Sequence, residues 1–66
     1  MMKIKVNGQE KEVSAQSVKE LVNELGMSGK PVVVEYNEQA LVASAHAQTQ
    51  LSEGDCLEIL VLGAGG

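Results

Sequence analysis

The chain is poor in the residue types that build disulfides, metal centres and nucleic-acid sites. Its one cysteine excludes an internal disulfide, so we expect a cytoplasmic protein rather than a secreted, disulfide-stabilised one. One cysteine and one histidine are too few for the usual zinc site, and we expect no bound metal. All five basic residues are lysines, against nine acidic residues. The net charge of -4 argues against a nucleic-acid partner and favours a protein with a basic docking surface.

Long apolar runs and aromatic side chains are also missing. No run approaches the ~20 residues of a membrane span, and the start of the chain carries no signal-peptide pattern, so we expect no membrane contact. Tyr36 is the only aromatic residue, which predicts an aliphatic core and a modest stability. Hydrophobic residues make up 44% of the 66, enough for the core of a single domain over residues 1–66.

The first half of the chain predicts a hairpin. Residues 2–6 alternate apolar and polar side chains, which is typical of a half-buried strand. Asn7-Gly8 follows, and both residues tolerate the positive φ that a two-residue hairpin turn requires. The polar segment 9–13 should return as an edge strand.

A short helix follows the hairpin. Ser17 and Glu20 have the spacing of a capping box, and Gly26 stands where a glycine commonly ends a helix. One apolar stripe joins these signals: Val18, Leu21, Val22 and Leu25. A helix of about two turns over 18–25 is unstable alone, so it must pack on the sheet.

The second half adds further strands. The apolar run 32–36 predicts an interior strand, with a turn after it, and residues 57–62 predict the last strand. Residues 40–50 are ambiguous between a helical turn and a short strand at Leu41-Val42. The order β-β-α-β-(short)-β predicts an α+β fold whose single helix covers one face of the sheet and leaves the other open.

The last predicted strand has two different sides. The side expected to face the helix carries Leu57, Ile59 and Val61. The side expected on the open face carries Glu58, Leu60 and Leu62. Two neighbouring leucines indicate a partner-docking patch, although scattered surface leucines are common. Glu58 could pair with a basic partner residue or remain solvated.

Neither Cys56 nor His46 lies in a catalytic motif. We expect Cys56 to be an ordinary thiol at the start of the last strand and His46 to be a solvated loop side chain. No paired acid and base or activated nucleophile is evident, so we expect no enzymatic activity.

The C-terminal residues carry the strongest functional signal. Three of the last four residues are glycine, directly after an apolar strand. We expect a globular body over 1–62 and a flexible tail over 63–66, which can extend about 13 Å. Such a tail would deliver the α-carboxylate of Gly66 to a partner's active site. A free carboxylate needs activation, for example as an acyl-adenylate, and the ATP must be bound by the partner because this chain has no phosphate-binding loop.

The chain resembles the thiamine-biosynthesis sulfur-carrier (ThiS) family of the ubiquitin-like β-grasp superfamily. The resemblance covers the whole chain and is strongest in the Gly54-Asp55 motif with the strand after it, and in the final Gly65-Gly66. It implies a β-grasp fold: a mixed four- to five-stranded sheet with one helix packed across one face. Its other matching segments are 2–8, 17–22 and 34–37.

The resemblance also implies a reaction. An E1-like enzyme uses ATP to adenylate Gly66, sulfur from a persulfide made by a cysteine desulfurase replaces AMP, and thiazole synthase takes the sulfur from the resulting thiocarboxylate. Gly66 would carry the sulfur, while Gly63, Ala64 and Gly65 would enter the partner's active site. The carrier itself would bind no cofactor.

Three observations keep alternatives open. Many relatives have a Val-Pro-Arg-like stretch where this chain reads Leu41-Val42-Ala43-Ser44, which leaves open how this loop contacts the family's partners. Carriers for molybdopterin and other sulfur pathways share the tail, so the tail does not select the pathway. A ubiquitin-like modifier or binding module would also fit a β-grasp body that ends in Gly-Gly.

Overall fold

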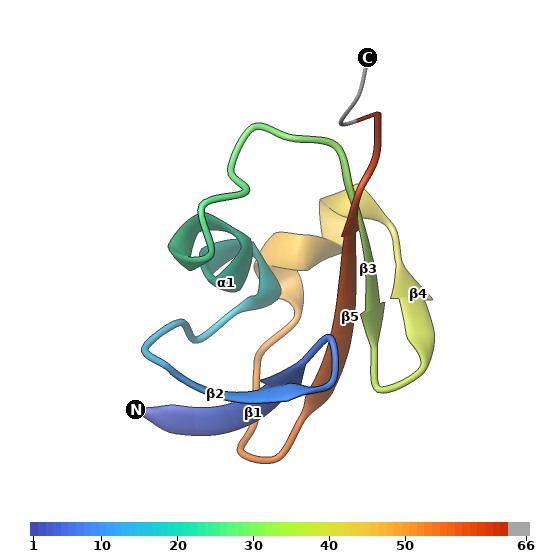
Figure 1. Ribbon diagram of the computed structural model, residues 1–66. Helices are drawn as coiled ribbons and strands as arrows, with labels where there is room; N and C mark the ends of the chain where they lie inside the picture. The colour runs from blue at the N-terminus through green and yellow to red at the C-terminus, as the bar shows by residue number, and fades with distance from the viewer. Residues whose placement is uncertain (64–66) are drawn as a thin grey trace.

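The computed structural model describes residues 1–63, which form one mixed five-stranded sheet and one α-helix (Figure 1). The elements are β1 Met2–Val6, β2 Gln9–Val13, α1 Val18–Glu24, β3 Val32–Tyr36, β4 Gln39–Leu41, the 3₁₀ helix η1 Ala43–Gln48, and β5 Cys56–Val61. The strand order is β2-β1-β5-β3-β4. The β1–β5 pair is parallel, and the other neighbours are antiparallel. The predicted α+β class is confirmed.

Two tight turns join the antiparallel pairs β1–β2 and β3–β4. Asn7 and Gly8 have φ values of 50° and 83° and join β1 to β2, as predicted. Asn37 and Glu38 have φ values of 48° and 73° and join β3 to β4. Positive φ at both central residues matches the right-handed twist of the flanking strands. Both sheet edges, β2 and β4, therefore come from hairpins.

The helix begins and ends close to the predicted positions. Ser17 Oγ accepts a hydrogen bond from the Glu20 backbone N–H at 3.2 Å. The Glu20 carboxylate accepts from the backbone N–H of Gln16 at 2.8 Å, one residue earlier than a standard capping box. The helix ends at Glu24 rather than Leu25, and Gly26 follows with φ 80°.

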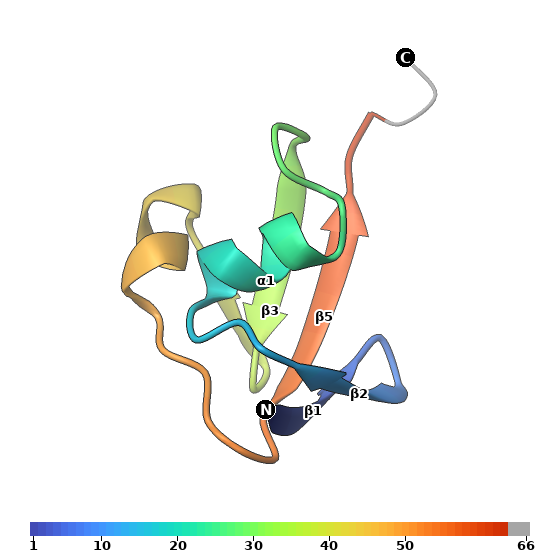
Figure 2. The same cartoon turned by 90° about the vertical axis from the view of Figure 1, so that its left-hand side faces the viewer.

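The core lies between the sheet and α1 and is aliphatic, as predicted. In Figures 1 and 2 both α1 and η1 lie on one side of the sheet. The buried apolar side chains are Ile4, Val6, Val13, Ala15, Val18, Leu21, Val22, Val34, Leu51, Leu57 and Ile59. The opposite side of the sheet has no helix over it within residues 1–63.

The ambiguous segment 40–50 contains both predicted alternatives. Its start belongs to β4, which ends at Leu41, and η1 occupies most of the remainder. The last strand also differs from the prediction, because β5 ends at Val61 and leaves Leu62 outside it. Val61 is the last residue of β5 paired with β3, opposite Val32, so the next position on β3 is Pro31. Proline has no N–H, so the ladder stops after a single Leu62 N–H to Pro31 oxygen bond of 2.8 Å.

Candidate functional site

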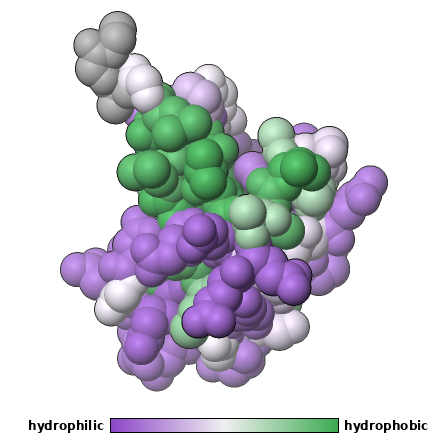
Figure 3. All heavy atoms as spheres, turned by 90° about the vertical axis from the view of Figure 1, so that its right-hand side faces the viewer, coloured by the Kyte–Doolittle hydropathy of each residue, from purple (hydrophilic) through white to green (hydrophobic). Residues whose placement is uncertain are grey.

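The open face of the sheet carries an exposed apolar patch, defined here as Val33, Val42, Leu60 and Leu62. Val33 and Leu60 lie directly opposite each other on β3 and β5. Their side chains are 39% and 62% exposed, and those of Val42 and Leu62 are 69% and 45% exposed. Figure 3 shows hydrophobic side chains gathered on the upper part of this face, above a hydrophilic region. The predicted exposure of Leu60 and Leu62 is confirmed; Val33 and Val42 were not predicted.

Two glutamates border the apolar patch. Glu35 on β3 lies directly opposite Glu58 on β5, and both side chains are exposed. A hollow of about 390 Å³ lies on this face. Its lining residues are Asn7, Val33, Glu35, Glu58, Ile59 and Leu60. The predicted docking residue Glu58 therefore lies beside Leu60 in one shallow site.

Asn7 fixes β5 at this site. Its carboxamide donates to the Ile59 carbonyl at 3.1 Å and accepts from the Ile59 N–H at 2.8 Å. Its backbone N–H donates to the Leu57 carbonyl at 2.9 Å. The side chain thus continues the parallel β1–β5 ladder beyond the end of β1. Because Ile59 stands between Glu58 and Leu60, these bonds position the part of β5 that carries the predicted docking residues.

Asp55 organises the turn that precedes β5. Its buried carboxylate accepts hydrogen bonds from the Ser52 N–H at 2.7 Å, the Tyr36 hydroxyl at 2.8 Å and the Asn37 amide at 3.2 Å. Burial raises the pKa of Asp55, but the bonds from Ser52, Asn37 and Tyr36 outweigh it and hold the pKa below its ordinary value. The hydrogen bond between the Tyr36 hydroxyl and Asp55, together with burial and the charge of Asp55, raises the pKa of Tyr36. The sequence predicted a turn here but not this network.

The path from β5 to the predicted tail begins within the described residues. Gly63 is exposed and has φ 63°, a left-handed conformation that favours glycine. Ala64, Gly65 and Gly66 lie outside the described residues. The predicted roles of these residues in insertion and sulfur transfer therefore remain predictions.

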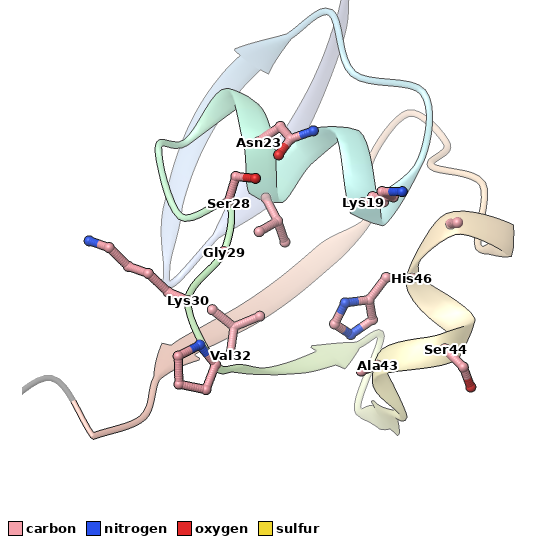
Figure 4. Close-up of a pocket in the computed structure, with 12 residues that line it drawn as sticks. Lys19, Asn23, Ser28, Gly29, Lys30, Val32, Ala43, Ser44 and His46 are labelled. Carbon is pink, nitrogen blue, oxygen red and sulfur yellow. The ribbon is translucent and has the colours of Figure 1, made fainter.

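His46 is buried, and the expectation of a solvated side chain is wrong. Its side chain is 9% exposed and extends from η1 into the space between α1 and β3 (Figure 4). Its Nε2 atom is buried and has no hydrogen-bond partner in the part of the chain that the structure describes. The ring lines a groove of about 580 Å³ between α1, η1 and the loop before β3. The prediction failed because an alanine-rich polar segment shows no apolar pattern, and burial arises only when η1 packs on α1.

Cys56 and His46 do not form a site. Cys56 is exposed on the open face as the first residue of β5, whereas His46 lies under α1 on the other side of the sheet. Among residues 1–63 no group of three or more histidine, cysteine, aspartate or glutamate side chains could hold a metal ion. Over the same residues, no helix has the length and apolar character needed to cross a membrane.

Comparison with known proteins decides the family. A model of the ThiS family matches residues 4–66. The chain belongs to the ThiS family. It is 31% identical to the sulfur carrier protein ThiS of Thermus thermophilus over 61 residues, which cover 92% of this chain and 95% of that protein. It is also 39% identical over 66 residues to a thiazole synthase of Paramagnetospirillum magneticum. That match covers 98% of this chain, which spans only 20% of the thiazole synthase.

A solved structure supports the same assignment. The crystal structure of the thiamine biosynthesis protein ThiS from Geobacter metallireducens superimposes with a TM-score of 0.82 at 32% identity. The match covers 98% of this chain and all of the other. The expected β-grasp arrangement, a mixed sheet with one helix across one face, is thus confirmed for this ThiS family member.

Proposed function

We propose that this protein is a sulfur carrier of thiamine biosynthesis, a protein cosubstrate rather than an enzyme. The observation that carries the proposal is the ThiS family match, which runs from residue 4 through the final Gly-Gly. The ThiS of Thermus thermophilus supports it, because that carrier aligns over 95% of its length.

The proposed chemistry takes place on the α-carboxylate of Gly66. An E1-like enzyme binds ATP, the carboxylate attacks the α-phosphorus, and pyrophosphate leaves. The terminal sulfur of a persulfide, supplied by a cysteine desulfurase or a persulfide-bearing protein, then attacks the acyl carbon and displaces AMP. A thiol cleaves the remaining S–S bond and leaves a thiocarboxylate on Gly66. Thiazole synthase takes this sulfur for the thiazole ring.

The proposed tail spans residues 63–66, and the proposed globular body spans residues 1–62. Gly63, Ala64 and Gly65 have no side chain larger than a methyl group, so they can pass through a narrow channel. Four extended residues reach about 13 Å, enough to bring Gly66 into an active site while the sheet stays on the partner's surface. The exposure and positive φ of Gly63 support this division, because the chain turns away from the β5 direction there.

The open face is the proposed docking surface. Leu60 lies near the end of β5 and Leu62 directly after it, next to the start of the proposed tail. Glu58 lies two residues before Leu60 on the same face. A partner that covers these leucines gains about 25 cal/mol for each Å² of apolar surface buried. Docking here would direct the tail toward the partner.

A reconstituted thiazole synthesis tests the proposed pathway. The mixture contains the activating enzyme, a cysteine desulfurase, thiazole synthase with its substrates, and cysteine with labelled sulfur. We expect labelled thiazole only when this chain is present. Label that reaches molybdopterin instead, or the chain joined to lysines through an isopeptide bond, would contradict the thiamine assignment.

A further inference from the structure

The charge pattern of the open face differs between its two halves. On the open face both lysines of β1 lie opposite a glutamate of β2: Lys3 opposite Glu12 and Lys5 opposite Glu10. On β3 and β5 the register instead places Glu35 directly opposite Glu58. Side chains at such positions are about 5 Å apart at Cβ, and like charges there destabilise a sheet.

No cation lies directly opposite either glutamate in the described sheet, although Lys5 is a diagonal neighbour and lines a second hollow together with both of them. On β4 the residue opposite Glu35 is Ala40. On β1 Lys5 lies opposite Cys56, two residues before Glu58. Within the described sheet, the register thus gives the two carboxylates no directly opposing cation. The pair sits at the edge of the proposed docking surface, where a partner can supply the missing charge.

The hollow beside this pair has two chemically different ends. Val33 and Leu60, directly opposite each other, form an apolar wall, and the pair Glu35–Glu58 follows two residues along the strands. A long basic side chain has the same division, with an aliphatic stem and a charged head. Arginine fits better than lysine, because its planar guanidinium has five N–H donors and can bridge two carboxylates.

We propose that the open face binds an arginine of the activating enzyme, with its stem on Val33 and Leu60 and its guanidinium between Glu35 and Glu58. This inference rests on the proposed function, which supplies the partner. Binding then removes a repulsion that the free carrier tolerates, so the pair favours the complex over the free protein. Because both carboxylates are exposed, the attraction is screened by salt.

Neutral replacements test the pair directly. We expect Glu35→Gln and Glu58→Gln each to weaken binding to the purified activating enzyme about tenfold at low ionic strength, the loss of a charge-assisted hydrogen bond. The difference from the unmodified protein should shrink as salt is added. Glu12→Gln removes the same charge from the same face outside the pair, and as the matched control it should change the affinity less than twofold.

Thermal unfolding separates recognition from a structural role. Each of the two variants should unfold at the same or a higher temperature than the unmodified protein, because the repulsion is relieved. A structural role for the pair would lower that temperature. Loss of affinity with unchanged or raised stability is the expected result.

Leu60→Ser distinguishes failure of this inference from failure of the proposed docking surface. If both glutamine variants bind as tightly as the unmodified protein while Leu60→Ser binds weakly, the arginine site is wrong and the docking surface stands. If Leu60→Ser also binds normally, the docking surface itself is wrong, and the arginine site fails with it.

Discussion

Replacing Asn7 by glycine should loosen β5 without disturbing the hairpin turn. The Asn7 carboxamide makes the two bonds to Ile59, of 2.8 and 3.1 Å, and glycine lacks it. Glycine adopts the φ of 50° found at this position at least as readily as asparagine. Asn7→Gly therefore removes the bonds to β5 and keeps the backbone conformation that closes the hairpin.

The expected loss is a large part of the total stability. Two neutral hydrogen bonds contribute about 1 kcal/mol each, so the substitution should cost about 2 kcal/mol. The greater freedom of glycine in the unfolded chain adds up to about 1 kcal/mol. A domain of this size has a free energy of unfolding of about 3–10 kcal/mol. A loss of 2 kcal/mol corresponds to a fall in Tm of about 8–16 °C.

Urea unfolding followed by circular dichroism measures the loss, because the chain has no tryptophan for fluorescence. Glu38→Gly is the matched control. It also places glycine at a positive φ, 73°, in the turn between β3 and β4. That variant should be as stable as the unmodified protein or slightly more stable, because glycine relieves the left-handed strain. If Asn7→Gly and Glu38→Gly differ by less than about 0.5 kcal/mol, the Asn7 side chain does not hold β5 as described.

Two further substitutions test buried polar groups. The pKa of Asp55 is lowered on folding, so its contribution to stability is present above the unfolded pKa of about 3.8 and is lost as the pH falls through the folded pKa. Asp55→Asn should therefore weaken the fall in stability below about pH 4, measured by urea unfolding at a series of pH values; an unchanged pH profile would exclude Asp55 as its source. His46→Leu should raise the free energy of unfolding by about 1 kcal/mol, because Nε2 is buried without a partner among residues 1–63. A lower free energy of unfolding would show that the imidazole makes a net stabilising interaction and would contradict this expectation.

The sequence predicted the elements set by local chemistry. Asn7-Gly8 closes the first hairpin because both residues tolerate positive φ, and this preference is a property of the dipeptide itself. Ser17 caps α1 for a similarly local reason. The two sides of β5 were also predictable, since an alternating strand can bury only one set of side chains.

Features that depend on distant segments were not predictable. Leu62 falls outside β5 because Pro31, far away in the sequence, lies at the next position on β3. His46 is buried by the packing of η1 on α1. Val33 looked like part of an interior strand, and it is exposed because no element of residues 1–63 forms a second layer over the open face. The opposition of Glu35 and Glu58 required the strand register, which no local pattern gives.

The intact mass of the protein after incubation with ATP, a sulfur source and its activating enzyme tests the central claim most directly. We expect replacement of one oxygen by sulfur in the unmodified chain. A chain that lacks Gly66 should fold normally and show no such change. An unchanged mass with an active enzyme, or sulfur incorporation that persists without Gly66, would contradict the proposal that the Gly66 carboxylate carries the sulfur.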